Sequence, residues 1–309
     1  FLLLTAVFIP LGVVLLLASK SVVEYELTYA GNKNSAHDYC TMQRNESLGG
    51  AYFCEGSKTF TVTKNMKPPI YVYYKLENFY QNHRRYADSR SDAQLAGSKV
   101  TASKLNTVCK PITYYGNSKG PVYSPCGLIA WSMFNDTFTI YNATADFDDE
   151  KSIVCDTATQ TGCTKKGIAW ASDRNVKFKN PSSYNNATVR MHPLTYFNES
   201  THVIPDVEDE DFIVWMRTAA LPNFRKLHRI IRKPIPAGEY ELNVVQNYPV
   251  KAFGGVKSVV ITTSSWIGGR NYFLAISYLV VGGITFTLAI LFLSGSLINC
   301  TIRRLRGNA

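Results

Sequence analysis

The side chains in this sequence that could carry out chemistry are its histidines, its acidic residues and its cysteines. The five histidines are scattered along the chain, at His37, His83, His192, His202 and His228. No pair of cysteines has C-x-x-C spacing, and no histidine stands at the distance from a cysteine that a structural zinc site uses. We therefore predict no metal site.

The densest run of acidic residues comprises Asp206, Glu208, Asp209, Glu210 and Asp211. Carboxylates this close together do not match a recognised cation-binding loop, so a solvated loop is favoured over a cation site. The sequence also contains no G-x-S-x-G turn, no glycine-rich phosphate loop and no H-E-x-x-H motif. We predict no catalytic residue and no cofactor, and conclude that the chain is not an enzyme.

Six of the seven cysteines lie in the central part of the chain, at Cys40, Cys54, Cys109, Cys126, Cys155 and Cys163. Six cysteines allow fifteen pairings, and their short sequential separations favour three local loops without excluding the other pairings. The same part of the chain holds the usable N-x-Ser/Thr sequons, at Asn45, Asn135, Asn142, Asn186 and Asn198. Together these residues predict a disulfide-bonded, glycosylated domain in the lumen of the secretory pathway.

The two ends of the chain are apolar and must be positioned differently from its middle. No charged residue occurs within residues 1–19 or within residues 271–302. A helix of roughly 20 residues crosses a hydrocarbon core of about 30 Å, so we predict transmembrane helices at 1–19 and 271–300. A signal-peptide core is the alternative for the first stretch, which we favour as a membrane helix whose preceding segment is missing.

The basic residues Arg303, Arg304 and Arg306 follow the second apolar stretch and predict a cytosolic tail over residues 301–309. Both termini are then cytosolic, and residues 20–270 form one exoplasmic domain. Residues 20–270 hold 30 basic and 23 acidic residues, and this charge of +7 is mild for 251 residues. It does not indicate a nucleic-acid partner, which a luminal location would exclude in any case.

The central domain is rich in residues that favour strands. Val, Ile, Thr, Tyr and Phe dominate runs at 59–62, 70–76, 137–141, 176–178, 212–216, 240–246 and 258–264. Helices are expected at 77–87 and after Pro222, where Phe224, Leu227 and Ile231 share one helical face. The basic residues of that second helix either attract lipid headgroups or an acidic partner loop, or form a solvated face. We predict an antiparallel β sandwich with short helical insertions.

The segment Phe212-Ile-Val-Trp-Met-Arg-Thr-Ala-Ala-Leu-Pro-Asn-Phe-Arg-Lys-Leu227 resembles the cell division control protein 50 family. Further resemblance comes from Gly238-Glu-Tyr240, Asn247-Tyr-Pro-Val250, Trp266-Ile-Gly-Gly-Arg-Asn-Tyr-Phe-Leu274 and, near the start, Phe8-Ile-Pro-Leu-Gly12. Asn223 stands where the family more often has Thr, and Arg270 where it has Lys. The pairs Cys40–Cys54 and Cys109–Cys126 match the family's local disulfides, and Cys155–Cys163 is a less general third pair.

The resemblance implies an accessory (beta) subunit of a type IV P-type ATPase, a phospholipid flippase. It implies a jelly-roll-like luminal domain, a heterodimer with the large catalytic subunit, contact with membrane lipids, and residence in the secretory or endosomal pathway. Family members let the ATPase leave the endoplasmic reticulum and complete its transport cycle, and they contribute no catalytic residue. As partner-contacting residues we predict Trp215, Arg217, Phe224, Arg225, Gly282 and Gly283, with the glycines permitting close helix packing.

Two other functions fit the same topology. A two-span ion-channel subunit also has cytosolic termini and a disulfide-rich ectodomain, but it needs a polar stripe along a membrane helix. Ser277, Thr285 and Thr287 do not clearly align on one face. A membrane-anchored luminal hydrolase or transferase would need a catalytic set, which the sequence lacks.

Overall fold

The computed structural model describes residues 1–31, 43–45, 51–115, 120–143, 153–181, 188–189 and 205–307. The chain divides into two compact units, which we call the helical unit (Phe1–Glu24 with Thr262–Ala309) and the β domain (Tyr25–Ile261). The predicted fold class, two apolar terminal helices flanking a domain of antiparallel β-sheets with short helices, is confirmed.

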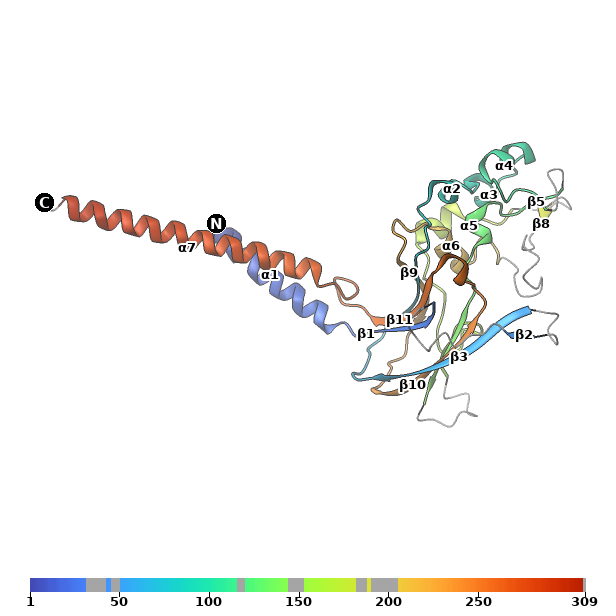
Figure 1. The fold of residues 1–309 in the computed structure, drawn as a ribbon, viewed down its shortest axis with the longest axis horizontal. Helices are drawn as coiled ribbons and strands as arrows, with labels where there is room; N and C mark the ends of the chain where they lie inside the picture. Colours follow the sequence, from blue (N-terminus) through green and yellow to red (C-terminus); the bar gives the residue numbers. More distant parts are fainter. Residues whose placement is uncertain are drawn as a thin grey trace. The chain divides into compact units, whose positions relative to one another are not determined.

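The helical unit is a pair of apolar helices, α1 (Leu2–Ser21) and α7 (Phe273–Gly307). Over Leu2–Ser21 and Phe273–Asn299 both are long and apolar enough to cross a membrane. They lie side by side (Figure 1), and buried Thr5 and Thr285 are joined by a hydrogen bond of 3.0 Å between their hydroxyl oxygens. A Cβ atom on Gly12 would stand 2.8 Å from Cγ of Leu279, so the absence of a side chain there lets the helices approach closely.

The β domain is built on two main sheets (Figure 1). One has the order β1 (Glu24–Ala30), β11 (Val256–Thr263), β4 (Ile70–Glu77), β9 (Phe224–Ile231). The other has the order β2 (Gln43–Asn45), β3 (Ala51–Val62), β10 (Gly238–Gln246), β6 (Thr137–Asn142), β7 (Ile153–Asp156). A small parallel pair joins β5 (Val122–Tyr123) to β8 (Thr188–Val189).

The sheets meet through side chains that alternate along their strands. In β4 the residues Ile70, Val72, Tyr74 and Leu76 are buried and the residues between them are partly exposed. Such alternation places one face of the sheet in the core. The ring of Phe138 on β6 lies 5.7 Å from that of Tyr29 on β1, so the cores of both sheets are continuous.

The helices of the β domain that the structure describes are all short and lie in the connections between strands. They are α2 (Arg84–Ala87), α3 (Asp92–Leu95), α4 (Ala102–Val108), α5 (Leu128–Trp131), the π-helix η3 (Asp173–Lys177), α6 (Glu210–Met216) and the 3-10 helix η4 (Lys251–Phe253). Two expectations are wrong here: the predicted helix at 77–87 is helical only over Arg84–Ala87, and the predicted strand at 176–178 is mostly the end of η3. Both windows were short, and tertiary contacts outweigh propensity at this length.

The elements around Pro222 are the reverse of those predicted from sequence. Phe212–Met216, expected as a strand, belongs to helix α6. It is apolar on several sides because Phe212, Ile213, Trp215 and Met216 are all buried, and a short buried helix has the same pattern as a buried strand. The helix predicted after Pro222 is strand β9.

A bulge at His228 interrupts the alternation of β9. Val72 of β4 pairs with Arg229 while Tyr73 pairs with Leu227, so His228 is one extra residue on β9. An extra residue interrupts the two-residue alternation of a strand and restores it one position later. Because of the extra residue, Phe224 and Ile231, seven residues apart, pair with the buried residues Leu76 and Ile70. Leu227 pairs with partly exposed Tyr73, so the three apolar residues do not share one face.

A buried ion pair lies inside the sandwich. The ammonium group of Lys257 on β11 is 2.6 Å from Oδ2 of Asp136, and both side chains are almost fully buried. Oδ1 of Asp136 accepts hydrogen bonds from the backbone N–H groups of Asn247 and Tyr248, both at 2.6 Å.

Candidate partner interface

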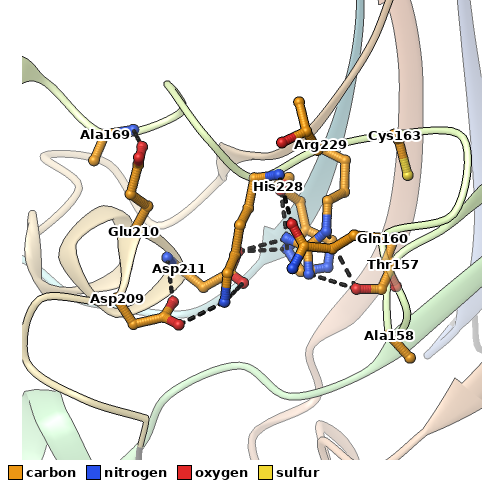
Figure 2. A network of polar contacts seen from close by, with 12 residues as sticks. Thr157, Ala158, Gln160, Cys163, Ala169, Asp209, Glu210, Asp211, His228 and Arg229 are labelled. Carbon is orange, nitrogen blue, oxygen red and sulfur yellow. Dashed lines mark hydrogen bonds and ion pairs between the residues drawn. The ribbon is translucent and has the colours of Figure 1, made fainter.

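Helix α6 begins the segment that carries the strongest family resemblance, and the acidic run fixes its N-terminus. Asp209 is the N-cap residue, and its carboxylate accepts a hydrogen bond from the backbone N–H of Asp211 at 2.9 Å. Oε2 of Glu210 accepts from the backbone N–H groups of Gly167 and Ala169, both at 2.9 Å (Figure 2). The expected solvated loop is therefore wrong for these residues, since Asp209 caps α6 and Glu210 binds the backbone at Gly167 and Ala169.

Asp211 also joins α6 to strand β9. Its Oδ1 accepts a hydrogen bond from Nη1 of Arg229 at 2.7 Å and lies 3.1 Å from Nδ1 of His228 (Figure 2). Nε and Nη2 of Arg229 donate to the carbonyl oxygen of Thr157 at 3.2 and 2.6 Å. The guanidinium is thus held from two sides, in a side chain that is only 6% exposed.

Protonation in this network follows from burial and charge. Burial raises the pKa of the Asp211 carboxyl, but its hydrogen bond with His228 and the charge of Arg229 outweigh this and lower the pKa to about 2. Burial lowers the pKa of His228, which favours the neutral ring. In the described part of the chain no three His, Cys, Asp or Glu side chains gather as a possible metal site. The hydrogen bonds of Asp211 and Arg229 tie α6 and the Thr157 carbonyl to β9.

Lys226 on β9 closes the other end of α6. Its ammonium group donates to the carbonyl oxygens of Val214, Trp215 and Arg217 at 3.2, 2.6 and 2.8 Å. The last carbonyls of a helix lack partners within the helix and carry partial negative charge, so a cation there stabilises the end. Burial lowers the pKa of Lys226, while its carbonyl acceptors favour the charged form. Helix α6 is therefore fixed at both termini.

Arg217, which follows α6, lies between two cavities at the surface. Both cavities are lined by Asp173, Ile213, Arg217 and Thr218, and their volumes are about 560 and 290 Å³. The guanidinium carbon of Arg217 lies 4.9 Å from the ring centroid of Trp170, at cation–π distance. Trp170 is 67% exposed and Val176 68%. We call Trp170, Asp173, Val176 and Arg217 the Arg217 surface.

The four residues of the β domain predicted to contact a partner lie at different depths. Trp215 is fully buried, and its Nε1 donates to the carbonyl oxygen of Ile129 at 2.6 Å, so it is a core residue. Phe224 is half-buried, with its ring 6.2 Å from that of Phe79. Arg217 and Arg225 are exposed. Trp215 thus supports the surface from below and offers it no contact area.

The two glycines predicted to contact a partner point in different directions. A Cβ atom on Gly282 would lie 2.7 Å from Cγ1 of Ile9 and 3.3 Å from its backbone nitrogen, so Gly282 packs against α1. A Cβ atom on Gly283 would meet nothing within 4 Å. Within the helical unit, the close approach at Gly282 is internal, and Gly283 lies on an open face of α7.

The structure contains the disulfides Cys109–Cys126 and Cys155–Cys163. Cys40 lies outside the described residues, so the pairing of Cys54 remains a prediction. Among the sequons, Asn45 lies in β2, Asn135 precedes β6 and Asn142 ends it. Asn186 and Asn198 lie outside the described residues, and glycosylation of all five remains a prediction.

Sequence reasoning missed the residues that do most to shape this surface. Trp170 stands in a segment without apolar periodicity, and only its exposure beside Arg217 marks it. The basic residues after Pro222 were predicted to lie on a helix, attracting a lipid or partner or forming a solvated face, whereas the structure buries Lys226 and Arg229 in strand β9. Acidic residues before an apolar run were the available signal for a helix N-terminus at Asp209.

Comparison with known proteins assigns the family. The model of the LEM3 (ligand-effect modulator 3)/CDC50 family matches residues 15–301. Cell cycle control protein 50A of Mus musculus is 38% identical over 309 residues, covering 95% of this chain and 81% of that protein. ALA-interacting subunit 3 of Arabidopsis thaliana is 42% identical over 300 residues, covering 94% of this chain and 77% of that protein. Cell cycle control protein 50B of Homo sapiens is 36% identical over 294 residues, with coverages of 90% and 80%. This chain therefore belongs to the LEM3/CDC50 family.

Proposed function

We propose that this chain is the non-catalytic accessory subunit of a type IV P-type ATPase that moves phospholipids between membrane leaflets. Family membership supports the proposal, together with the name of a relative described as an interacting subunit. In this role the chain is an integral membrane protein with two membrane spans and both termini in the cytosol. Its β domain lies in the lumen of the secretory or endosomal pathway or outside the cell.

The Arg217 surface is the part of the β domain that we assign to the partner. Arg, Trp and aliphatic side chains that stand exposed around a cavity are the usual composition of a binding hot spot. The backbone beneath them is already ordered, because α6 is fixed by Asp209 at its start and by Lys226 at its end. A pre-ordered surface loses little conformational entropy on binding, which favours affinity.

The helical unit supplies the second set of contacts. Helix α1 packs against Gly282, whereas Gly283 has open space around it. Gly283 is therefore the place where a helix of the ATPase can approach the α7 backbone. Contacts in the membrane and in the lumen then act as two linked binding sites, and each raises the effective concentration of the other. Holding the ATPase in both places stabilises its folding, its export from the endoplasmic reticulum and its transport cycle.

The observation that carries the proposal is the family match over residues 15–301, and purification under native conditions tests it. The full chain, extracted in mild detergent, is expected to form a one-to-one complex with a large P-type ATPase. A stable homo-oligomer without ATPase would refute the proposal and favour the channel-subunit alternative.

The same purification tests the Arg217 surface. Arg217→Glu reverses a charge that is 57% exposed and is expected to weaken recovery of the ATPase at least tenfold, the usual loss at a hot spot of about 2 kcal/mol. Arg84→Glu is the matched control, because Arg84 is 93% exposed and lies away from both cavities. Equal recovery with both variants would remove Arg217 from the interface while leaving the proposed function intact.

A further inference from the structure

The loop between β11 and α7 contains a tight turn of four residues, Ser265 to Gly268. Two backbone hydrogen bonds close it, from the N–H of Ser265 to the carbonyl of Gly268 at 2.8 Å and in the reverse direction at 2.9 Å. The Ser265 hydroxyl also donates to the carbonyl of Gly268 at 3.1 Å. Gly268 has a φ of +115°, which favours glycine. The turn is thus rigid and well defined.

The two residues at the tip of this turn are large and apolar, which is unusual for a turn exposed to water. Tips of tight turns favour Gly, Asn, Asp, Ser and Pro, whereas this one holds Trp266 and Ile267. Trp266 is 74% exposed and Ile267 38% exposed. The turn therefore presents a large amphipathic ring outward.

The ends of the two helices locate this turn along the direction of the membrane. The Ser19 hydroxyl, near the end of α1, accepts a hydrogen bond from the backbone N–H of Asn271 at 3.0 Å. This bond places the end of α1 and the start of α7 at one level. The apolar part of α7, Phe273–Asn299, has 27 residues and is roughly 40 Å long, about the thickness of a bilayer with its headgroup layers. The start of α7 therefore lies among headgroups.

Basic side chains stand at the same level. Lys20 in the last turn of α1 is exposed, and so is Arg270 just before α7. The Arg270 guanidinium lies 5.1 Å from the ring centroid of Tyr272 and its Nε donates to the tyrosine hydroxyl at 2.9 Å, which holds it beside the helix start. Cations at this depth attract lipid phosphates, and Trp and Tyr are enriched there.

We propose that the Ser265–Gly268 turn is an interfacial anchor that inserts Trp266 and Ile267 into the headgroup and glycerol layer of the bilayer. Arg270 and Lys20 bind phosphate groups of the same lipids. The occupant of this surface is lipid rather than protein, because the turn continues into a helix apolar enough to span the membrane and carries cations at headgroup depth. The inference rests on membrane insertion and does not depend on the identity of the ATPase.

Quenching of tryptophan fluorescence by brominated lipid tests the anchor. The full chain is reconstituted in phosphatidylcholine vesicles whose acyl chains carry bromine near the glycerol end, and its emission is compared with that in unbrominated vesicles. The wild-type chain is expected to show a quenched component, and Trp266→Phe is expected to lose most of it. The variant keeps an aromatic ring at the turn, so its fold is preserved.

Trp170→Phe is the matched control, because Trp170 is 67% exposed but belongs to the β domain. It is expected to keep the quenched component. Quenching of Trp266→Phe equal to that of the wild-type chain would overturn the proposal, and so would a wild-type chain without bromine-dependent quenching. The second result would show that protein, not lipid, covers the turn. Neither result bears on whether the chain binds an ATPase.

Discussion

Asp211→Asn removes the negative charge that ties α6 to β9 and leaves the shape of the side chain almost unchanged. In the folded chain Arg229 then keeps its bonds to the Thr157 carbonyl but loses its only carboxylate within 3 Å among the described residues. Removing one partner of a buried ion pair destabilises a protein by roughly 3–5 kcal/mol. Because Arg229 keeps its hydrogen bonds to the Thr157 carbonyl, we expect a loss of stability at the lower end of this range.

The pKa of Asp211 provides a second estimate. The shift from its ordinary value of 3.8 to about 2 corresponds to roughly 2.5 kcal/mol. Because the folded-state pKa lies below the unfolded-state value, this stabilisation is present above the unfolded value of 3.8 and is lost as the pH falls through the folded value of about 2. We expect Asp211→Asn to lose about 3 kcal/mol at neutral pH and the difference to narrow in strong acid.

Urea unfolding of the full chain in detergent measures this loss of stability. The transition is followed by tryptophan fluorescence, which changes as the buried Trp131 and Trp215 become exposed. Burial lowers the pKa of His228, so acid favours the unfolded state, which binds this proton more readily. The Asp211 charge partly raises that pKa, so Asp211→Asn lowers it further, and the loss of stability through His228 in acid is larger in the variant. The charged groups beside His228 are Asp211, Arg229 and Lys165.

The control for this prediction is an exposed ion pair. Asp88→Asn breaks the contact with Arg84, whose side chain is 93% exposed, and is expected to cost less than about 0.5 kcal/mol. If Asp211→Asn unfolds at the same urea concentration as the wild-type chain, or if the gap between them stays constant in acid, the ion pair does not stabilise the fold.

Two further predictions concern single positions. Lys226→Met keeps the length of the side chain but leaves three carbonyls at the end of α6 without their donor. We therefore expect the free energy of unfolding to fall by about 2–4 kcal/mol in the same urea experiment. Unchanged stability would show that water replaces the ammonium group. Gly282→Leu is expected to lower the temperature at which the chain aggregates in detergent, because a side chain there meets the α1 backbone at Ile9. Gly283→Leu is the matched substitution with open space around it, and an equal effect of both would contradict the packing described for α1 and α7.

The sequence predicted correctly those helices and strands whose residue pattern depends only on which side chains meet water or an apolar environment. Stretches of uncharged residues long enough to span a bilayer produced the two helices with nearly the predicted bounds. Strands with strict alternation, such as that at 70–76, were also predicted correctly, because one buried face is enough to generate the pattern.

The region that shapes the candidate interface was not predictable in the same way. The bulge at His228 brings Phe224 and Ile231 of β9, seven residues apart as in a helical pattern, to one face. Burial on several sides gave helix α6 the composition of a strand. Either pattern is ambiguous over eight residues, since the number of sides that become buried depends on neighbours far along the chain.

The sequence by itself determined that this chain has two apolar ends and a cysteine-rich β domain, and its motifs identified its family. Only the tertiary structure decided which residues face outward. Trp215 and Trp170 are the same residue type, yet the first is fully buried and the second largely exposed beside Arg217. The physical reason is that membrane partition depends on local composition, whereas burial within a sandwich depends on which strands and helices meet across it.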